Sequence, residues 1–168
     1  MPTLDFVEQI RQHVKTQAEE HGEHALDREQ RLNWWRSKVD ALTTQMKQWL
    51  EPLITDETIS VRQKSVRINE DRLGDYELPA LEFCFGLSSL SVTPVGSVII
   101  GALGRVDIAG PEGKAMLILT ADDAESSPSF KQEHARWFIS YPEQRLKLFE
   151  LDESSFRQLI VDLLGVGD

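Results

Sequence analysis

The feature that most constrains the fold is a continuous helical periodicity over the first third of the chain. Between residues 3 and 53 the only glycine is Gly22, and the only proline, Pro52, stands close to the end. Steps of three and four residues follow one face of an α-helix, and the apolar signal on this face weakens between residues 18 and 28. In the second half of the segment these steps connect a series of apolar side chains: Leu32, Trp35, Val39, Leu42, Met46, Trp49 and Leu53.

Two structures fit this pattern. One is a single helix of about 50 residues, about 75 Å long, which would need a partner along its length. The other is a helical hairpin, in which Gly22 ends the first helix in the left-handed conformation and Asp27, with Gln30, caps the second. We favour the hairpin, because a compact domain has little use for so long a rod unless it dimerises.

After Pro52 the periodicity changes from helical to alternating, which is typical of β-strands. Ile59 and Val61 alternate with polar residues, and Val66 and Ile68 then alternate in the opposite phase. Because a shift of one residue moves side chains to the other face of a sheet, this change of phase indicates a β-bulge or two short strands.

The clearest hairpin lies between residues 98 and 119, where Gly110-Pro111-Glu112-Gly113 has strong turn chemistry. Near the end of the chain, the apolar spacing and Gly165 predict a short helix. Helices and strands come in separate runs, which favours an α+β fold with a mostly antiparallel sheet. We expect a single domain over residues 1–168: a helical segment at 1–53, a sheet of six to eight strands at 54–151, and a short helix at 152–165 packed on the sheet.

The charge balance narrows the range of partners. The chain has 28 acidic and 18 basic side chains and a formal charge of −10. Because phosphate backbones attract clustered Lys and Arg and an acidic body is repelled, we expect no nucleic-acid binding. No signal-peptide pattern is visible, and no apolar run approaches the roughly 20 residues of a membrane span. The sequence therefore predicts a cytoplasmic protein that does not insert into a membrane.

Residues of the types that bind metals or perform catalysis do not form a recognisable motif. His21 and His24 are three residues apart, so a helix would put them on one face, where they are weak candidates for metal ligands. A pair is only half a site, and polar residues at a helix turn explain it more simply. No serine–histidine–carboxylate group or phosphate-binding glycine motif stands out. We therefore assign no catalytic residue, metal or cofactor.

Arg105 and Asp107 are the most interesting polar pair, because they alternate with apolar residues and so project from the same sheet face. If solvent covers that face, they form an ordinary exposed ion pair; if the N-terminal helices cover it, they form a polar cluster suited to a ligand. Trp137 and Tyr141 would complete the lining of such a pocket. Trp34 stands beside the apolar face of the second helical half, where it either packs inside the fold or contacts a partner.

Two functional hypotheses follow from these observations. The first is a non-catalytic protein-interaction module that acts through its acidic sheet half or its helical face, with a homodimer formed through the N-terminal helices. Bacterial immunity proteins and secretion chaperones share this small, acidic character, which is a likeness of composition alone. The second is a small-molecule-binding protein or an enzyme that uses a pocket between a curved sheet and its helices. We favour the first, because no catalytic constellation is visible.

Overall fold

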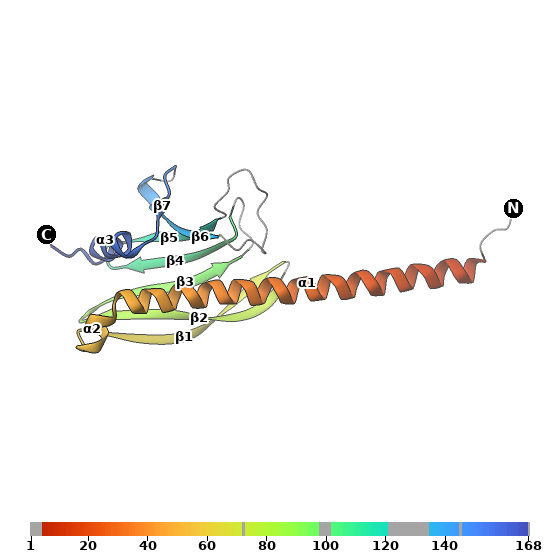
Figure 1. The fold of residues 1–168 in the computed structure, drawn as a ribbon, viewed down its shortest axis with the longest axis horizontal. Coiled ribbons are helices and arrows are strands. Elements are labelled where there is room, and N and C mark those ends of the chain that lie inside the picture. The colour runs from red at the N-terminus through yellow and green to blue at the C-terminus, as the bar shows by residue number, and fades with distance from the viewer. Residues whose placement is uncertain (1–4, 72, 98–101, 121–134, 145, 168) are drawn as a thin grey trace.

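The computed structural model describes residues 5–71, 73–97, 102–120, 135–144 and 146–167, without the side chains of residues 21–26. Over these residues the chain forms helices at its two ends and a seven-stranded sheet between them, which confirms the predicted α+β fold (Figure 1). The helices are α1 (Phe6–Trp49), α2 (Glu51–Thr55) and α3 (Glu153–Leu164), with a 3₁₀ turn η1 (Pro142–Gln144) before the last strand. The strands are β1 (Ile59–Glu70), β2 (Gly74–Phe85), β3 (Ser88–Gly96), β4 (Gly104–Gly110), β5 (Gly113–Thr120), β6 (Arg136–Ser140) and β7 (Phe149–Glu150).

The sheet is a meander in which every strand pairs antiparallel with the next along the chain. Three of its connections, β1–β2, β2–β3 and β4–β5, are tight turns, which suffice to join antiparallel neighbours. The β4–β5 hairpin forms where the sequence predicts it, with Gly110 paired to Gly113 and Pro111 in the turn. The number of strands falls within the predicted six to eight.

The favoured helical hairpin is wrong, and the alternative of one long helix is what forms. α1 runs without a break from Phe6 to Trp49, about 66 Å at 1.5 Å per residue. Gly22 continues the helix, and Asp27 and Gln30 lie within it rather than capping a second one. The physical reason is that a single glycine costs a helix only about 1 kcal/mol relative to alanine, which does not suffice to end it.

Only the second half of α1 packs on the sheet. Its apolar face is buried there at Trp35, Val39, Leu42 and Met46, whereas the first half projects beyond the sheet (Figure 1). α3 lies on the same face of the sheet as α1, since the rings of Trp49 and Phe156 are 5.2 Å apart. The strands contribute a matching set of buried side chains: Leu81, Phe83, Leu90, Val92, Val106, Ile108, Leu117, Leu119 and Ile139.

The change of phase between Val61 and Val66 lies within one strand, β1, which contains neither a bulge nor a break. β1 and β2 pair in one continuous register along their whole length, so the expectation of a bulge or of two short strands is wrong. The buried side of β2 nevertheless changes between Ala80 and Leu81, which are both buried. β2 pairs with β3 only from Leu81 onward. The part of the hairpin before Leu81 therefore extends beyond β3 without pairing to it. We attribute the change in which face of β2 is buried to strand twist. The twist turns the Tyr76 side chain toward α1.

The C-terminal helix forms where the sequence predicts it. Asp152 and Ser155 make a reciprocal capping box at its start, and Gly165 ends it with a φ of 69° in the left-handed region. Its buried stripe packs on the sheet, as expected. Among the helices in the described parts of the chain, none combines the length and the apolar character needed to cross a membrane.

Candidate functional site

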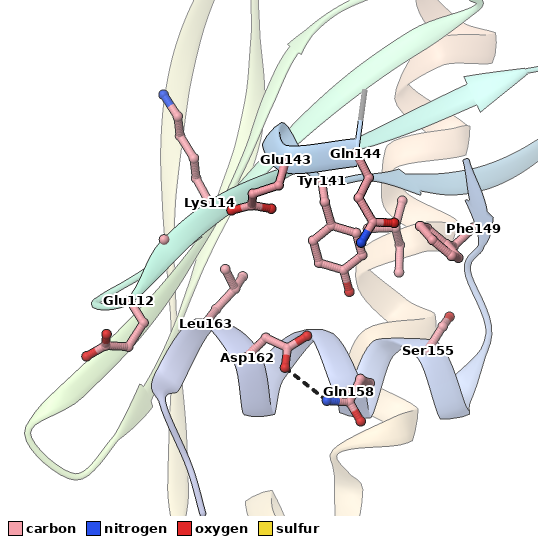
Figure 2. A pocket seen from close by; sticks show the side chains of 12 residues that line it. Glu112, Lys114, Tyr141, Glu143, Gln144, Phe149, Ser155, Gln158, Asp162 and Leu163 are labelled. Carbon is pink, nitrogen blue, oxygen red and sulfur yellow. Dashed lines mark hydrogen bonds between the residues drawn. The ribbon is translucent and has the colours of Figure 1, made fainter. Parts of the chain in front are cut away.

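A pocket of about 490 Å³ lies between α3, the β4–β5 turn and the segment that follows β6 (Figure 2). Two aromatic side chains line it, Tyr141 and Phe149, whose ring centroids are 5.8 Å apart in an edge-to-face arrangement. Ile139 and Leu163 add apolar surface. The polar lining comes from the β4–β5 hairpin, from η1 and from α3: Glu112, Lys114, Glu143, Gln144, Ser155, Gln158 and Asp162.

Backbone contacts hold the walls of this pocket together. The backbone N–H of Glu112 in the β4–β5 turn donates to the carbonyl oxygen of Leu163 in α3, at 2.9 Å. Gly110 lies so close to α3 that a Cβ atom there would stand 2.7 Å from the same oxygen. At the other end of α3, the Ser155 hydroxyl donates to the carbonyl oxygen of Glu150, next to Phe149, at 2.8 Å. The turn, the last strand and α3 are thus held in a defined arrangement.

The electrostatic character of the pocket is acidic around Tyr141. Burial raises the pKa of Tyr141 above its usual value, and the negative charges of Asp162 and Glu143 raise it further. Figure 2 shows the Tyr141 ring extending toward α3, with Asp162 on the helix beside it and the Lys114 side chain directed away from the ring. The Asp162 carboxylate accepts a hydrogen bond from the Gln158 amide at 2.9 Å. Carboxylates beside aromatic faces form a setting that attracts cations.

The structure does not bring the predicted pocket residues together. Arg105 and Asp107 form a bidentate ion pair with each other, at 2.7 and 3.1 Å, on the sheet face opposite α1. This is the ordinary, partly exposed pair that the sequence offered as one of two alternatives. Trp137 lies on the other face, where its ring centroid is 6.1 Å from that of Trp35 in α1. Of these predicted residues, Tyr141 alone lines the pocket beside α3.

The remaining candidates lie on α1. Trp34 is half-buried beside the apolar face, and the Lys38 ammonium group is 5.7 Å from its ring centroid. The side chains of His21 and His24 lie outside the described part of the structure, so their metal-binding role stays a weak prediction. Within the residues that the structure describes, no group of three His, Cys, Asp or Glu side chains is placed to hold a metal ion.

The sequence pattern does not predict a buried polar cluster that the structure shows at the distal end of the β1–β2 hairpin. The Glu70 carboxylate accepts hydrogen bonds from the Tyr76 hydroxyl and from the backbone N–H of Ser97, the latter at 2.8 Å. Arg31 of α1 donates to the Ser97 carbonyl oxygen at 3.0 Å. Its members come from four separate segments, so no local pattern could have revealed them. The cluster holds the hairpin against α1, which is a structural role.

The second candidate surface is the projecting half of α1. Four apolar side chains are exposed there: Phe6 by 72%, Val7 by 47%, Ile10 by 47% and Val14 by 56%. At about 100° per residue, all four fall within a sector of about 100° on the helix surface, and the buried side chains of the second half of α1 fall within the same sector. This face of α1 is therefore apolar in two stretches, one covered by the sheet and one uncovered, and the apolar pattern weakens between residues 18 and 28.

A comparison with known proteins finds no matching family model, no matching curated protein and no matching solved structure. The function of the chain must therefore be inferred from these two surfaces.

Proposed function

We propose that this chain is a protein-interaction module that binds a second copy of itself through the projecting half of α1, residues 6–30. The observation that carries the proposal is the exposed apolar stripe of Phe6, Val7, Ile10 and Val14. Single exposed apolar residues are normal on a protein surface, but a contiguous stripe of them is typical of an interaction site.

The physics of an isolated helix supports a partner for this segment. A helix without tertiary contacts is only marginally stable in water, and most helices in proteins are stabilised by packing of their apolar face. When two such stripes pack against each other, each fully buried aliphatic or aromatic side chain contributes about 1.5–3 kcal/mol. Association would therefore stabilise the helix and bury the stripe in one step.

The charge distribution favours a second copy as the partner. Residues 5–18 contain two acidic side chains, Asp5 and Glu8, and two basic ones, Arg11 and Lys15, so the stripe lies in a segment of zero net charge. The rest of the chain carries the whole formal charge of −10. Two copies repel each other over most of their surface, but not along this segment.

The size of the contact sets the expected affinity. Residues 6–18 span about 20 Å of helix, and two such lengths bury less than the roughly 1,200 Å² of a standard stable interface. We therefore expect a weak dimer, with a dissociation constant of about 10–100 µM.

Sedimentation equilibrium with two matched double variants tests the proposal. Ile10→Glu with Val14→Glu puts two charges into the stripe, whereas Gln12→Glu with Thr16→Glu puts the same two charges on the opposite side of the helix, about 200° away. We expect the first variant to remain monomeric and the second to dimerise like the unaltered protein. All four positions are exposed, so neither variant disturbs the core.

Two results would overturn the proposal. One is an unaltered protein that remains monomeric at about 0.5 mM, far above the expected dissociation constant. The other is an equal loss of dimer in both variants, which would assign the effect to added charge rather than to the stripe.

A further inference from the structure

We propose that the pocket beside α3 binds an organic cation, an ammonium or guanidinium group, held between the Tyr141 ring and the Asp162 carboxylate. This site is separate from the projecting half of α1, and the inference does not depend on the proposed self-association.

The first argument is the balance of charge around the pocket. Among the lining residues that the structure describes, three carry a carboxylate (Glu112, Glu143 and Asp162) and one is basic (Lys114). The side chains of Lys114 and Glu112 are both directed away from Tyr141, which leaves Asp162 and Glu143 as the charges that act on that ring (Figure 2). An anionic ligand would be repelled by these two carboxylates, whereas a cation would form charge-assisted hydrogen bonds with them.

The second argument is the state of the polar groups beside the aromatic rings. Gln158 donates to Oδ1 of Asp162, which orients the carboxylate and leaves Oδ2 available to a ligand. Tyr141 is partly buried, and the negative charge of Asp162 acts on it. A cation placed over an aromatic ring, within about 6 Å of its centroid, gains a further attraction. The two rings therefore supply an aromatic face for a cation, and Asp162 supplies a carboxylate that accepts its hydrogen bonds.

The third argument is the shape of the pocket. A volume of about 490 Å³ lies within the range of small-molecule sites and exceeds what one ordered water needs. The contacts of Leu163 with the β4–β5 turn hold α3 in place, so the site exists before a ligand binds. A pre-formed site loses less entropy on binding, which supports affinity for a small group.

The test is a titration of the isotope-labelled full chain, followed by NMR chemical shifts, with N-acetyl-arginine amide as the probe. The neutral N-acetyl-norleucine amide, of similar length, is the control ligand. We expect shift changes at Tyr141, Phe149 and the residues of α3 with the cationic probe, and none there with the neutral one. A glycine-arginine-glycine tripeptide distinguishes two sources of the cation. Binding tighter than that of N-acetyl-arginine amide indicates a side chain of another protein. Equal binding indicates a free small molecule.

A matched pair of variants identifies the residue responsible. Both aspartates are exposed, but Asp162→Asn removes a charge that lines the pocket, whereas Asp40→Asn removes the same charge from α1, outside the pocket lining. We expect the dissociation constant of N-acetyl-arginine amide to rise about tenfold in the first variant, the loss expected for one charge-assisted hydrogen bond. The second variant should bind like the unaltered protein.

The proposal is overturned if the cationic probe causes no shift changes at the pocket, or if the neutral probe causes the same ones. It is also overturned if Asp162→Asn and Asp40→Asn change the affinity equally, because the attraction would then be that of the whole acidic molecule. Thermal unfolding of each variant shows that the fold is intact, so a loss of binding reports on the site.

Discussion

The indole ring of Trp35 occupies the space directly above Gly104, where the side chain of any other residue would begin. Trp35 is fully buried and belongs to the half of α1 that packs on the sheet. A glycine within a strand often marks the close approach of another segment, and here that segment is α1. This contact holds the covered half of the helix at close range to β4.

We expect Gly104→Ala to lower the free energy of unfolding by about 1–3 kcal/mol, because the added methyl group overlaps the Trp35 ring. Trp35→Phe reduces that ring, so the double variant should lose less stability than the sum of the two single losses. Urea unfolding of the four proteins measures this coupling. Strictly additive losses would show that the two residues do not interact as described.

Tyr76 should make the protein sensitive to high pH. Burial and the hydrogen bond to Glu70 raise the pKa of Tyr76 above its usual value of 10.0. Above pH 10 the unfolded chain therefore loses the hydroxyl proton while the folded protein keeps it, so stability falls as the pH rises. For each pH unit above pH 10, we expect the free energy of unfolding to fall by about 1 kcal/mol more in the unaltered protein than in Tyr76→Phe.

Urea unfolding at a series of alkaline pH values checks this expectation. Tyr141 is present in both proteins, so its own contribution cancels in the comparison. Equal losses of stability in the unaltered protein and in Tyr76→Phe would contradict the assignment to Tyr76.

The two halves of α1 should differ in hydrogen exchange. At a concentration where the chain is monomeric, we expect backbone amides in residues 6–30 to exchange at least about 100-fold faster than those in residues 35–49, because only the latter are protected by packing on the sheet. Mass spectrometry of peptides from each half measures the ratio. Raising the concentration should slow exchange in residues 6–18 of the unaltered protein but not of Ile10→Glu with Val14→Glu. Uniform protection along α1 in the monomer would contradict this division.

Asp162→Asn should lower the pKa of Tyr141 toward its ordinary value, because a negative charge that disfavours the phenolate is removed. Burial is the larger cause of the raised pKa of Tyr141 and remains in the variant, so this pKa should stay above the ordinary value of a tyrosine. The chain has two tyrosines, so a Tyr76→Phe background leaves Tyr141 as the sole phenol whose ultraviolet absorbance reports the titration. Asp40→Asn in the same background is the control, and a pKa equally lowered by it would contradict the assignment.

Several elements could be predicted from the sequence because their signals are local. The capping box of Asp152 and Ser155 and the left-handed Gly165 define α3 within fourteen consecutive residues. The turn at Pro111 likewise defines the β4–β5 hairpin. In these places backbone preference and side-chain pattern agree, and neighbouring residues supply the hydrogen bonds.

The β1–β2 hairpin and α1 show where local reasoning fails. From the sequence, the opposite phases of Val61 and Val66 predict a bulge or two short strands, but they reflect which side of a continuous hairpin is covered. Likewise, the weak apolar signal around Gly22 favours a turn, although a helix tolerates one glycine. In the hairpin the pattern recorded burial, which depends on distant segments, rather than a break in the backbone.

The sequence by itself determined that the front of the chain carries apolar residues at helical spacing, more weakly between residues 18 and 28, and that an antiparallel sheet follows. Helical and strand periods are properties of consecutive residues. Only the tertiary structure decided that the sheet covers Trp35 and leaves Ile10 uncovered. Only it placed Tyr141, Phe149 and Asp162 around one pocket. The physical reason is that these groupings arise from contacts between elements far apart along the chain, and such contacts leave no spacing in the sequence from which they could be predicted.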